Sequence, residues 1–159
     1  MGAAEDHLLR TLAWVAPGTR VIEVGCGAGD TTAQLVALGL DVRASDADVS
    51  AVNRCRTRLA GVAGPASDER VRLCTPWALP DPDGLAGWGV VSRMPADPDV
   101  WPALFAELAR VVAPGGWIWV RGGRATGAAA REAGLLLAEV PTADGPDAHV
   151  VYRRPDAAT

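Results

Sequence analysis

Three glycines at alternate positions mark the point where an apolar segment of the chain becomes an amphipathic one. The stretch VIEVGCGAGDTTAQL covers residues 21–35, with Gly25, Gly27 and Gly29 following an acid, Glu23. Glycine permits tight turns and lets the main chain approach a ligand closely. In a doubly wound sheet, a turn from the first strand into the first helix borders the ligand site. The stretch therefore predicts an α/β fold that binds a ligand at this turn.

The rest of the chain alternates between short apolar segments and amphipathic ones. We expect strands at 20–24, 41–45, 70–74, 88–93 and 117–121, and helices at 4–15, 30–38, 48–60, within 95–112 and at 125–133. Two late strands, 135–140 and 148–153, are joined by the short stretch 141–147. They should pair antiparallel, because a parallel crossover needs a dozen residues or more. The predicted fold class is α/β, a three-layer, doubly wound, mostly parallel seven-stranded sheet with an antiparallel final strand.

Helix ends and loops follow from local residue types. Asp30 is expected to cap the helix after the glycines, with Gly39 just past its end, and Asp48 or Ser50 to cap the next helix. Residues 61–69 are expected to form a loop, and residues 75–87 are rich in turn-forming residues. Pro114 and the two glycines after it should end the helix within 95–112.

Length and composition favour one domain. The chain has 159 residues, of which 49% are hydrophobic, enough for one core. We expect a single domain over 1–159, with an N-terminal helix in 1–18, a core in 19–154 and a tail in 155–159. There is no run of 18 apolar residues, and acids stand where a signal peptide would carry basic residues. We therefore expect no membrane span and a cytoplasmic location.

Charge and cysteine content argue against a nucleic-acid partner, a disulfide framework and a metal site. The net charge of −4 gives no signal for a nucleic-acid partner. All 15 basic residues are arginine, so the arginine content reflects a bias of the whole chain. Cys26, Cys55 and Cys74 are an odd set without metal-ligand spacing. We expect three reduced, mostly buried thiols and no metal site.

The glycine spacing separates two kinds of nucleotide ligand. A dinucleotide fingerprint needs a third glycine three residues after Gly27, and this chain has Asp30 there. A carboxylate at the start of a helix also repels a phosphate. A nicotinamide-dependent oxidoreductase is thus the rival enzyme class that the spacing opposes. The pattern favours an adenosine derivative without phosphates.

At this point the residues resemble a known family. The sequence E-x-G-x-G-x-G at 23–29 is similar to motif I of class I S-adenosylmethionine-dependent methyltransferases. The resemblance continues in LGLDVRASDAD at 38–48, ALPDPDGLAGWGVV at 78–91 and LFAELARVVAPGGWIWV at 104–120. It ends with AREAGLLLAEV at 130–140 and AHVVYRRP at 148–155, and it covers about residues 8–154.

The resemblance implies a Rossmann-like methyltransferase fold, the cofactor S-adenosyl-L-methionine and a methyl-transfer activity. Main chain at Gly25–Gly27 would lie against the methionine part, with Glu23 orienting the loop near the cofactor's amino group. The oxygens of Asp46 could accept both ribose hydroxyls, and Ala47 and Trp77 would pack by the adenine. The full set of implied cofactor-binding residues is Glu23, Gly25, Cys26, Gly27, Gly29, Asp46, Ala47, Thr75 and Trp77.

Two positions depart from the family pattern. Relatives often carry an Asp and a free N–H where Thr75 and Pro76 stand, and proline has no N–H to donate to adenine. Relatives also often have an aromatic-Asp pair where Trp88 and Gly89 stand. These departures leave open an alternative: a cofactor-binding but catalytically inactive homologue that acts as a partner subunit.

The acceptor is not identified by the sequence. Methyl transfer from a sulfonium needs alignment more than acid–base help, and we name no catalytic residue; His7 and His149 are expected to be structural or solvated. Ser92, Arg93, Met94 and Arg121 are the candidate substrate-binding residues, and the arginines, with Arg124, could bind an anion. The acceptor is expected to be a small molecule. Because the domain is close to a bare core, a homodimer partner could close the acceptor pocket, or the acceptor could be a large, open surface.

Overall fold

The computed structural model describes residues 2–64, 67–140, 145 and 147–158. Its helices are α1 (Ala3–Leu12), α2 (Asp30–Ala37), α3 (Val49–Ala63), α4 (Ser67–Arg70), α5 (Trp101–Val111) and α6 (Gly127–Glu132), with short 3-10 turns at Pro98–Val100 and Arg124–Thr126. Its strands are β1 (Arg20–Val24), β2 (Asp41–Asp46), β3 (Val71–Leu73), β4 (Ala86–Val91), β5 (Val112–Arg121), β6 (Leu136–Glu139) and β7 (His149–Arg153).

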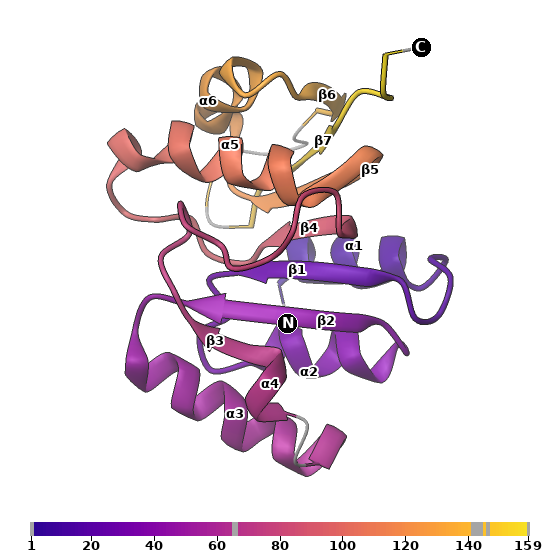
Figure 1. Ribbon diagram of the computed structural model, residues 1–159, viewed down its shortest axis with the longest axis vertical. Coiled ribbons are helices and arrows are strands. Elements are labelled where there is room, and N and C mark those ends of the chain that lie inside the picture. The colour runs from indigo at the N-terminus through magenta and orange to yellow at the C-terminus, as the bar shows by residue number, and fades with distance from the viewer. Residues whose placement is uncertain (1, 65–66, 141–144, 146, 159) are drawn as a thin grey trace.

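The seven strands form one sheet in the order β3-β2-β1-β4-β5-β7-β6. Strands β1 to β5 run parallel to one another, and β7 runs antiparallel to both β5 and β6. Figure 1 shows α3 beside β3 at one end of the sheet and α6 at the other. The predicted doubly wound sheet and its antiparallel final strand are confirmed.

Helices cover both faces of the sheet. On one face, α1, α2 and α3 pack against Val21, Val42, Val90 and Trp119. On the other face, α5 and α6 pack against a second set of strand side chains. The sheet is therefore the middle of three layers, and its strand ends are left free to build a site.

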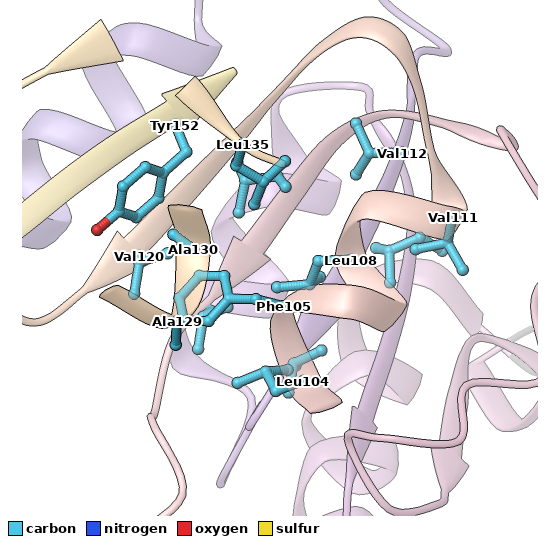
Figure 2. Packing of buried hydrophobic residues seen from close by; sticks show 14 of the residues in the cluster. Leu104, Phe105, Leu108, Val111, Val112, Val120, Ala129, Ala130, Leu135 and Tyr152 are labelled. Atoms are coloured by element: carbon cyan, nitrogen blue, oxygen red, sulfur yellow. The ribbon is translucent and has the colours of Figure 1, made fainter. Parts of the chain in front are cut away.

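Helix α5 shows how sequence periodicity becomes packing. Leu104, Phe105 and Leu108 are fully buried and point toward the sheet (Figure 2). The ring of Phe105 meets Tyr152 of β7 edge-on, with ring centroids 5.8 Å apart. Such a pair is more stabilising than the burial of its apolar surface alone. The hydroxyl of Tyr152 lies 2.7 Å from Thr126 Oγ1, so its polar end is satisfied.

Some local expectations are wrong, and tertiary contacts explain why. Asp30 does not cap α2: the capping position is Gly29 in a left-handed conformation, and the Asp30 carboxylate pairs with Arg58 of α3 at 2.9 Å. Helix α3 runs three residues past its expected end, and α4 forms inside the expected loop. Asp48 does cap α3, accepting from Ser50 N at 2.9 Å. The expected turn at 141–147 lies mostly outside the described residues.

Within the described part of the chain, the helices are too short or too polar to span a bilayer. The cytoplasmic location and the single domain over 1–159 stay predictions.

Candidate functional site

The glycine loop between β1 and α2 needs glycine for two separate reasons. Gly25, Gly27 and Gly29 have φ of +72°, +55° and +88°, a region that other residues rarely adopt. A Cβ at Gly25 would also lie 2.6 Å from the carbonyl oxygen of Arg93, and one at Gly29 would lie 2.8 Å from Cys55 Sγ. The loop is therefore clamped between the end of β4 and helix α3.

Asp46 at the end of β2 faces this loop. Its Oδ2 accepts from Gly27 N at 3.0 Å, and its Oδ1 accepts from Asp48 N at 3.0 Å. A carboxylate oxygen can accept more than one hydrogen bond, so each oxygen keeps capacity for a ligand hydroxyl. The two amide bonds fix the orientation of the carboxylate toward the hollow beside it.

A first hollow, which we call the apolar hollow, opens at the carboxyl ends of β1, β2 and β4 and has a volume of about 230 Å³. Apolar side chains dominate its walls, and Asp46 lies at its edge. Its lining residues are Val24, Gly25, Ser45, Asp46, Ala47, Cys74, Pro76, Trp77, Arg93, Met94 and Pro95.

A second, polar hollow of about 290 Å³ lies on the other side of the glycine loop. Its walls come from α1, the loop, the start of α2 and the ends of β4 and β5. Its lining residues are Glu5, Gly25, Cys26, Gly27, Ala28, Asp30, Thr31, Ser92, Arg93 and Arg121. Gly25 and Arg93 border both hollows, so one extended ligand can pass from one to the other along the loop.

Glu23 lies beneath the loop and lines neither hollow. It is fully buried, and its two oxygens accept from Thr32 Oγ1 at 2.6 Å and from Ser92 Oγ at 2.7 Å. Burial raises the pKa of Glu23 from 4.5 to about 6, against the lowering effect of the two hydroxyls. Glu23 thus ties α2 and the end of β4 to β1 and orients Ser92 in the polar hollow.

The remaining predicted cofactor residues divide into two groups. Ala47 and the half-exposed Trp77 line the apolar hollow, as the resemblance implies. Cys26 borders the polar hollow and is itself buried in the core cluster that includes Cys55 of α3. Gly29 and Thr75 line neither hollow: Gly29 begins α2, and the carbonyl of Thr75 closes a turn with Ala78 N. All three cysteines are free, and Cys74 is the half-buried one.

Pro76 is buried and lines the apolar hollow in place of Thr75. It offers no N–H there, and Cys74 and Trp77 line the same hollow. Gly89 is not near the hollow: it is buried in the middle of β4, and a Cβ there would lie 3.2 Å from Val112 Cγ2. The departure from the family pattern at Gly89 therefore lies away from the apolar hollow.

The candidate acceptor residues sit where two strands end. Met94 lines the apolar hollow, Ser92 and Arg121 line the polar one, and Arg93 borders both. Among the described residues, no carboxylate pairs with Arg93 or Arg121; the guanidinium of Arg121 lies 5.9 Å from the ring centroid of Trp119. Arg124 lines neither hollow.

Glu5 is a site residue that the sequence did not reveal. It comes from α1, and its Oε1 accepts from Thr31 Oγ1 at 2.8 Å and from Gln34 Nε2 at 3.3 Å. These bonds hold α1 against α2 and make α1 one wall of the polar hollow. The sequence shows an acid on an amphipathic helix and nothing about where that helix docks.

The comparison with family models decides the identity. A model described as "Methyltransferase domain" matches residues 21–116, more than half of the chain. The chain belongs to the methyltransferase-domain family. The predicted class I family, its cofactor S-adenosylmethionine and the prediction of an enzyme are thereby confirmed. No curated protein sequence matches the chain.

Solved structures share the fold of this methyltransferase. A geranyl diphosphate methyltransferase in complex with GPP and sinefungin superimposes with a TM-score of 0.76 at 16% identity, covering 96% of this chain and 78% of that one. A TehB-like SAM-dependent methyltransferase from Corynebacterium glutamicum gives 0.71 at 16%, covering 96% and 88%. The [4+2]-cyclase SpnF gives 0.74 at 15%, covering 96% and 82%. The methyltransferase fold is thus shared with a cyclase.

Proposed function

We propose that this methyltransferase binds S-adenosylmethionine along its glycine loop and transfers the methyl group to a small, anionic acceptor. The observation that carries the proposal is the meeting of the apolar and polar hollows at Gly25. An adenosyl group matches the apolar walls, with its ribose hydroxyls at Asp46. An amino-acid end matches the polar hollow, which offers carboxylates and guanidinium groups together.

The residues present fit the cofactor. Gly25 borders both hollows, and its missing side chain lets the loop pack against the Arg93 carbonyl, because a Cβ there would lie 2.6 Å from Arg93 O. Asp46 is held by two main-chain N–H groups and keeps acceptor capacity for a diol. The carboxylate of Glu5 and the guanidinium of Arg93 border the same hollow, and opposite charges suit a zwitterion.

The bound cofactor supplies a methyl group already activated on a sulfonium. The chain's own task is therefore to align the acceptor and keep water away. Ser92 is oriented by Glu23 at 2.7 Å, and Met94 and Pro95 supply apolar surface beside it. A general base is needed only if the attacking atom must lose a proton.

We propose that Arg121 binds an anionic group of the acceptor. It lies at the carboxyl end of β5, borders the polar hollow and stacks near Trp119. Arg93 borders both hollows, so it can meet the cofactor's carboxylate, the acceptor's anion or both. One structural neighbour is a geranyl diphosphate C-methyltransferase in complex with geranyl diphosphate, which gives a phosphorylated acceptor as one chemistry to screen.

Indole NMR tests where the cofactor sits. On addition of S-adenosylhomocysteine, the indole N–H signal of Trp77 should shift, because Trp77 lines the apolar hollow. The signal of Trp14, whose side chain is 92% exposed on the turn after α1, should not move. A ligand that shifts neither signal, or both equally, would contradict the proposed placement.

A turnover assay tests the acceptor class. Formation of S-adenosylhomocysteine is measured with matched acceptors that carry or lack a carboxylate or phosphate. Loss of one charge-assisted contact should raise the KM of Arg121→Ala for the anionic acceptor by about tenfold or more. Arg124→Ala, which removes an arginine outside both hollows, is the control and should behave like wild type. Cofactor binding without any turnover would favour the alternative of an inactive partner subunit.

A further inference from the structure

Four polar or aromatic side chains meet where α1 lies against the sheet, away from both hollows. They are His7 of α1, Trp119 of β5, Glu139 of β6 and His149 of β7. Trp119 Nε1 lies 3.3 Å from His7 Nδ1, and His7 Nε2 lies 3.0 Å from Glu139 Oε1. The ring of His149 stacks on that of His7 with centroids 3.8 Å apart. We call these four residues the α1 latch.

The donors and acceptors of the latch fix the charge of His7. An indole N–H is only a donor, so His7 Nδ1 must accept, and the ring proton must be on Nε2, facing Glu139. His7 is therefore neutral in this arrangement. A second proton on Nδ1 would point at the indole N–H and break the bond to Trp119.

His149 makes protonation of the latch still less favourable. Its side chain is 8% exposed, and Nε2 has no hydrogen-bond partner among the described residues, lying 3.6 Å from Glu139 Oε1. Burial lowers the pKa of His149 and the facing His7 lowers it further, against the pull of Glu139. Two protonated imidazoles stacked at 3.8 Å would repel each other.

The position of α1 matters for the polar hollow. Glu5 lies two residues before His7 on the same helix, bonds to Thr31 at 2.8 Å and lines that hollow. The helix has only ten residues, so its two ends move together. Ala4, Leu8 and Leu12 keep α1 in the core, so opening of the latch would shift Glu5 relative to the glycine loop without detaching the helix.

Other charged groups face the latch from each packed element. The guanidinium of Arg121 lies over the Trp119 ring and opposes added positive charge. Glu5 and Arg10 share α1 with His7, and Asp147, before β7, lies beside Gly2 at the start of α1. Glu139 is the carboxylate that pairs with the two imidazoles. Glu139 alone faces two stacked rings, so it cannot neutralise both.

A metal ion is the competing occupant. The ligand atoms of His7, Glu139 and His149 lie within 4.8 Å of one another. An ion at His7 Nε2 needs the lone pair there, which a neutral ring offers only if Nδ1 carries the proton and releases Trp119. Stacked rings also direct their lone pairs side by side rather than at one point. The geometry favours a proton-sensitive contact over a metal site.

We propose that His7 is a positioning residue: its neutral form holds α1, and Glu5 with it, against the glycine loop, and its protonation releases this wall of the cofactor site. The inference rests on the proposed function for the ligand at the polar hollow. It assigns a role to His7, which the sequence alone left as structural or solvated.

The test compares the pH dependence of ligand binding in matched variants. Calorimetry with S-adenosylhomocysteine is run between about pH 5.5 and 7.5, the range of histidine titration, on wild type, His7→Asn and His7→Phe. Asn places an oxygen near the position of Nδ1, accepts from Trp119 and does not titrate. Wild type should lose affinity by about tenfold across the range, His7→Asn by about threefold or less, and His7→Phe should bind weakly throughout.

Glu23 titrates in the same range in all three proteins, so the difference between the curves reports on His7. Parallel curves for wild type and His7→Asn would overturn the proposal. So would binding of Zn²⁺ to chelator-treated wild type that raises Tm and is lost in His7→Asn. If wild type ignores S-adenosylhomocysteine at every pH, the proposed function fails, but the latch is still tested. The Trp119 indole signal should then shift with acid in wild type and not in His7→Asn.

Discussion

Thr32 Oγ1 donates a 2.6 Å hydrogen bond to Glu23 Oε2 inside the core, and Ser92 Oγ donates to the other oxygen at 2.7 Å. One carboxylate therefore joins β1, α2 and the end of β4 beneath the ligand loop. It is fully buried with no cationic partner among the described residues, and this explains its raised pKa. The arrangement makes the loop rigid at the expense of burying a charge.

Replacing Glu23 tests this cost. A pKa raised from 4.5 to about 6 means that the folded chain binds the proton more tightly than the unfolded chain. Protonated Glu23 therefore adds about 2 kcal/mol to the free energy of unfolding below pH 4.5. This contribution is lost as the pH rises through 6. Thermal unfolding should show Glu23→Gln gaining stability relative to wild type as the pH rises from about 4.5 to 8.

Glu107→Gln supplies a control of opposite sign. Its hydrogen bond with Arg110 is the largest of the effects that lower the pKa of Glu107. Ionised Glu107 therefore stabilises the folded chain, fully so above its ordinary pKa of 4.5, and this stabilisation is lost as the pH falls. This variant should be less stable than wild type at pH 8 and should approach it in acid. Two variants with parallel pH profiles would contradict the account of both groups.

Gly25→Ala should damage the loop more than its backbone conformation alone explains. Gly18 has a similar φ of +81°, but a Cβ there meets nothing within 4 Å. Gly18→Ala should therefore show only the left-handed strain, about 1 kcal/mol. Gly25→Ala adds the clash with Arg93 O and should cost about 3 kcal/mol or more. Equal losses of stability in urea unfolding would show that the loop is not clamped by β4.

Gly89→Asp should not improve the adenine site. A side chain at Gly89 points at Val112, Ile118 and Leu108, within 3.2–3.4 Å. A carboxylate buried among these aliphatic groups has no partner, so unfolding should be easier by about 3 kcal/mol or more. Gly89→Ala needs only a small shift of Val112 and is the milder control. Tighter binding of S-adenosylhomocysteine to Gly89→Asp would contradict this placement.

Much of the fold could be predicted because local signals agreed. Strand β1 has its expected bounds, Arg20–Val24, since apolar residues there are bracketed by Pro17-Gly18 and the glycine loop. The alternation of strand and helix segments predicted a mostly parallel sheet, and the short final connection predicted that the last two strands pair antiparallel. The same agreement places Asp46 beside the loop, because carboxyl ends of neighbouring parallel strands meet at one edge of a sheet.

The parts that could not be predicted depend on contacts between distant segments. Asp30 is a good capping residue by type, yet Arg58 of α3 takes its carboxylate. A turn closed by Thr75 and Ala78 presents Pro76 to the hollow instead of Thr75. Glu5 becomes a site residue only because α1 docks on α2 through Thr31. None of these pairings leaves a local sequence pattern.

Calorimetry with S-adenosylhomocysteine and Asp46→Asn tests the cofactor site most directly. Wild type should bind S-adenosylhomocysteine and not NAD. Asp46→Asn keeps the shape but loses the charge that accepts the ribose hydroxyls, so its affinity should fall by about tenfold to a hundredfold. Asp68→Asn, at an exposed carboxylate on α4, should bind like wild type. Wild-type protein that ignores S-adenosylhomocysteine at millimolar concentration, or an Asp46→Asn variant that binds it equally well, would contradict the assignment.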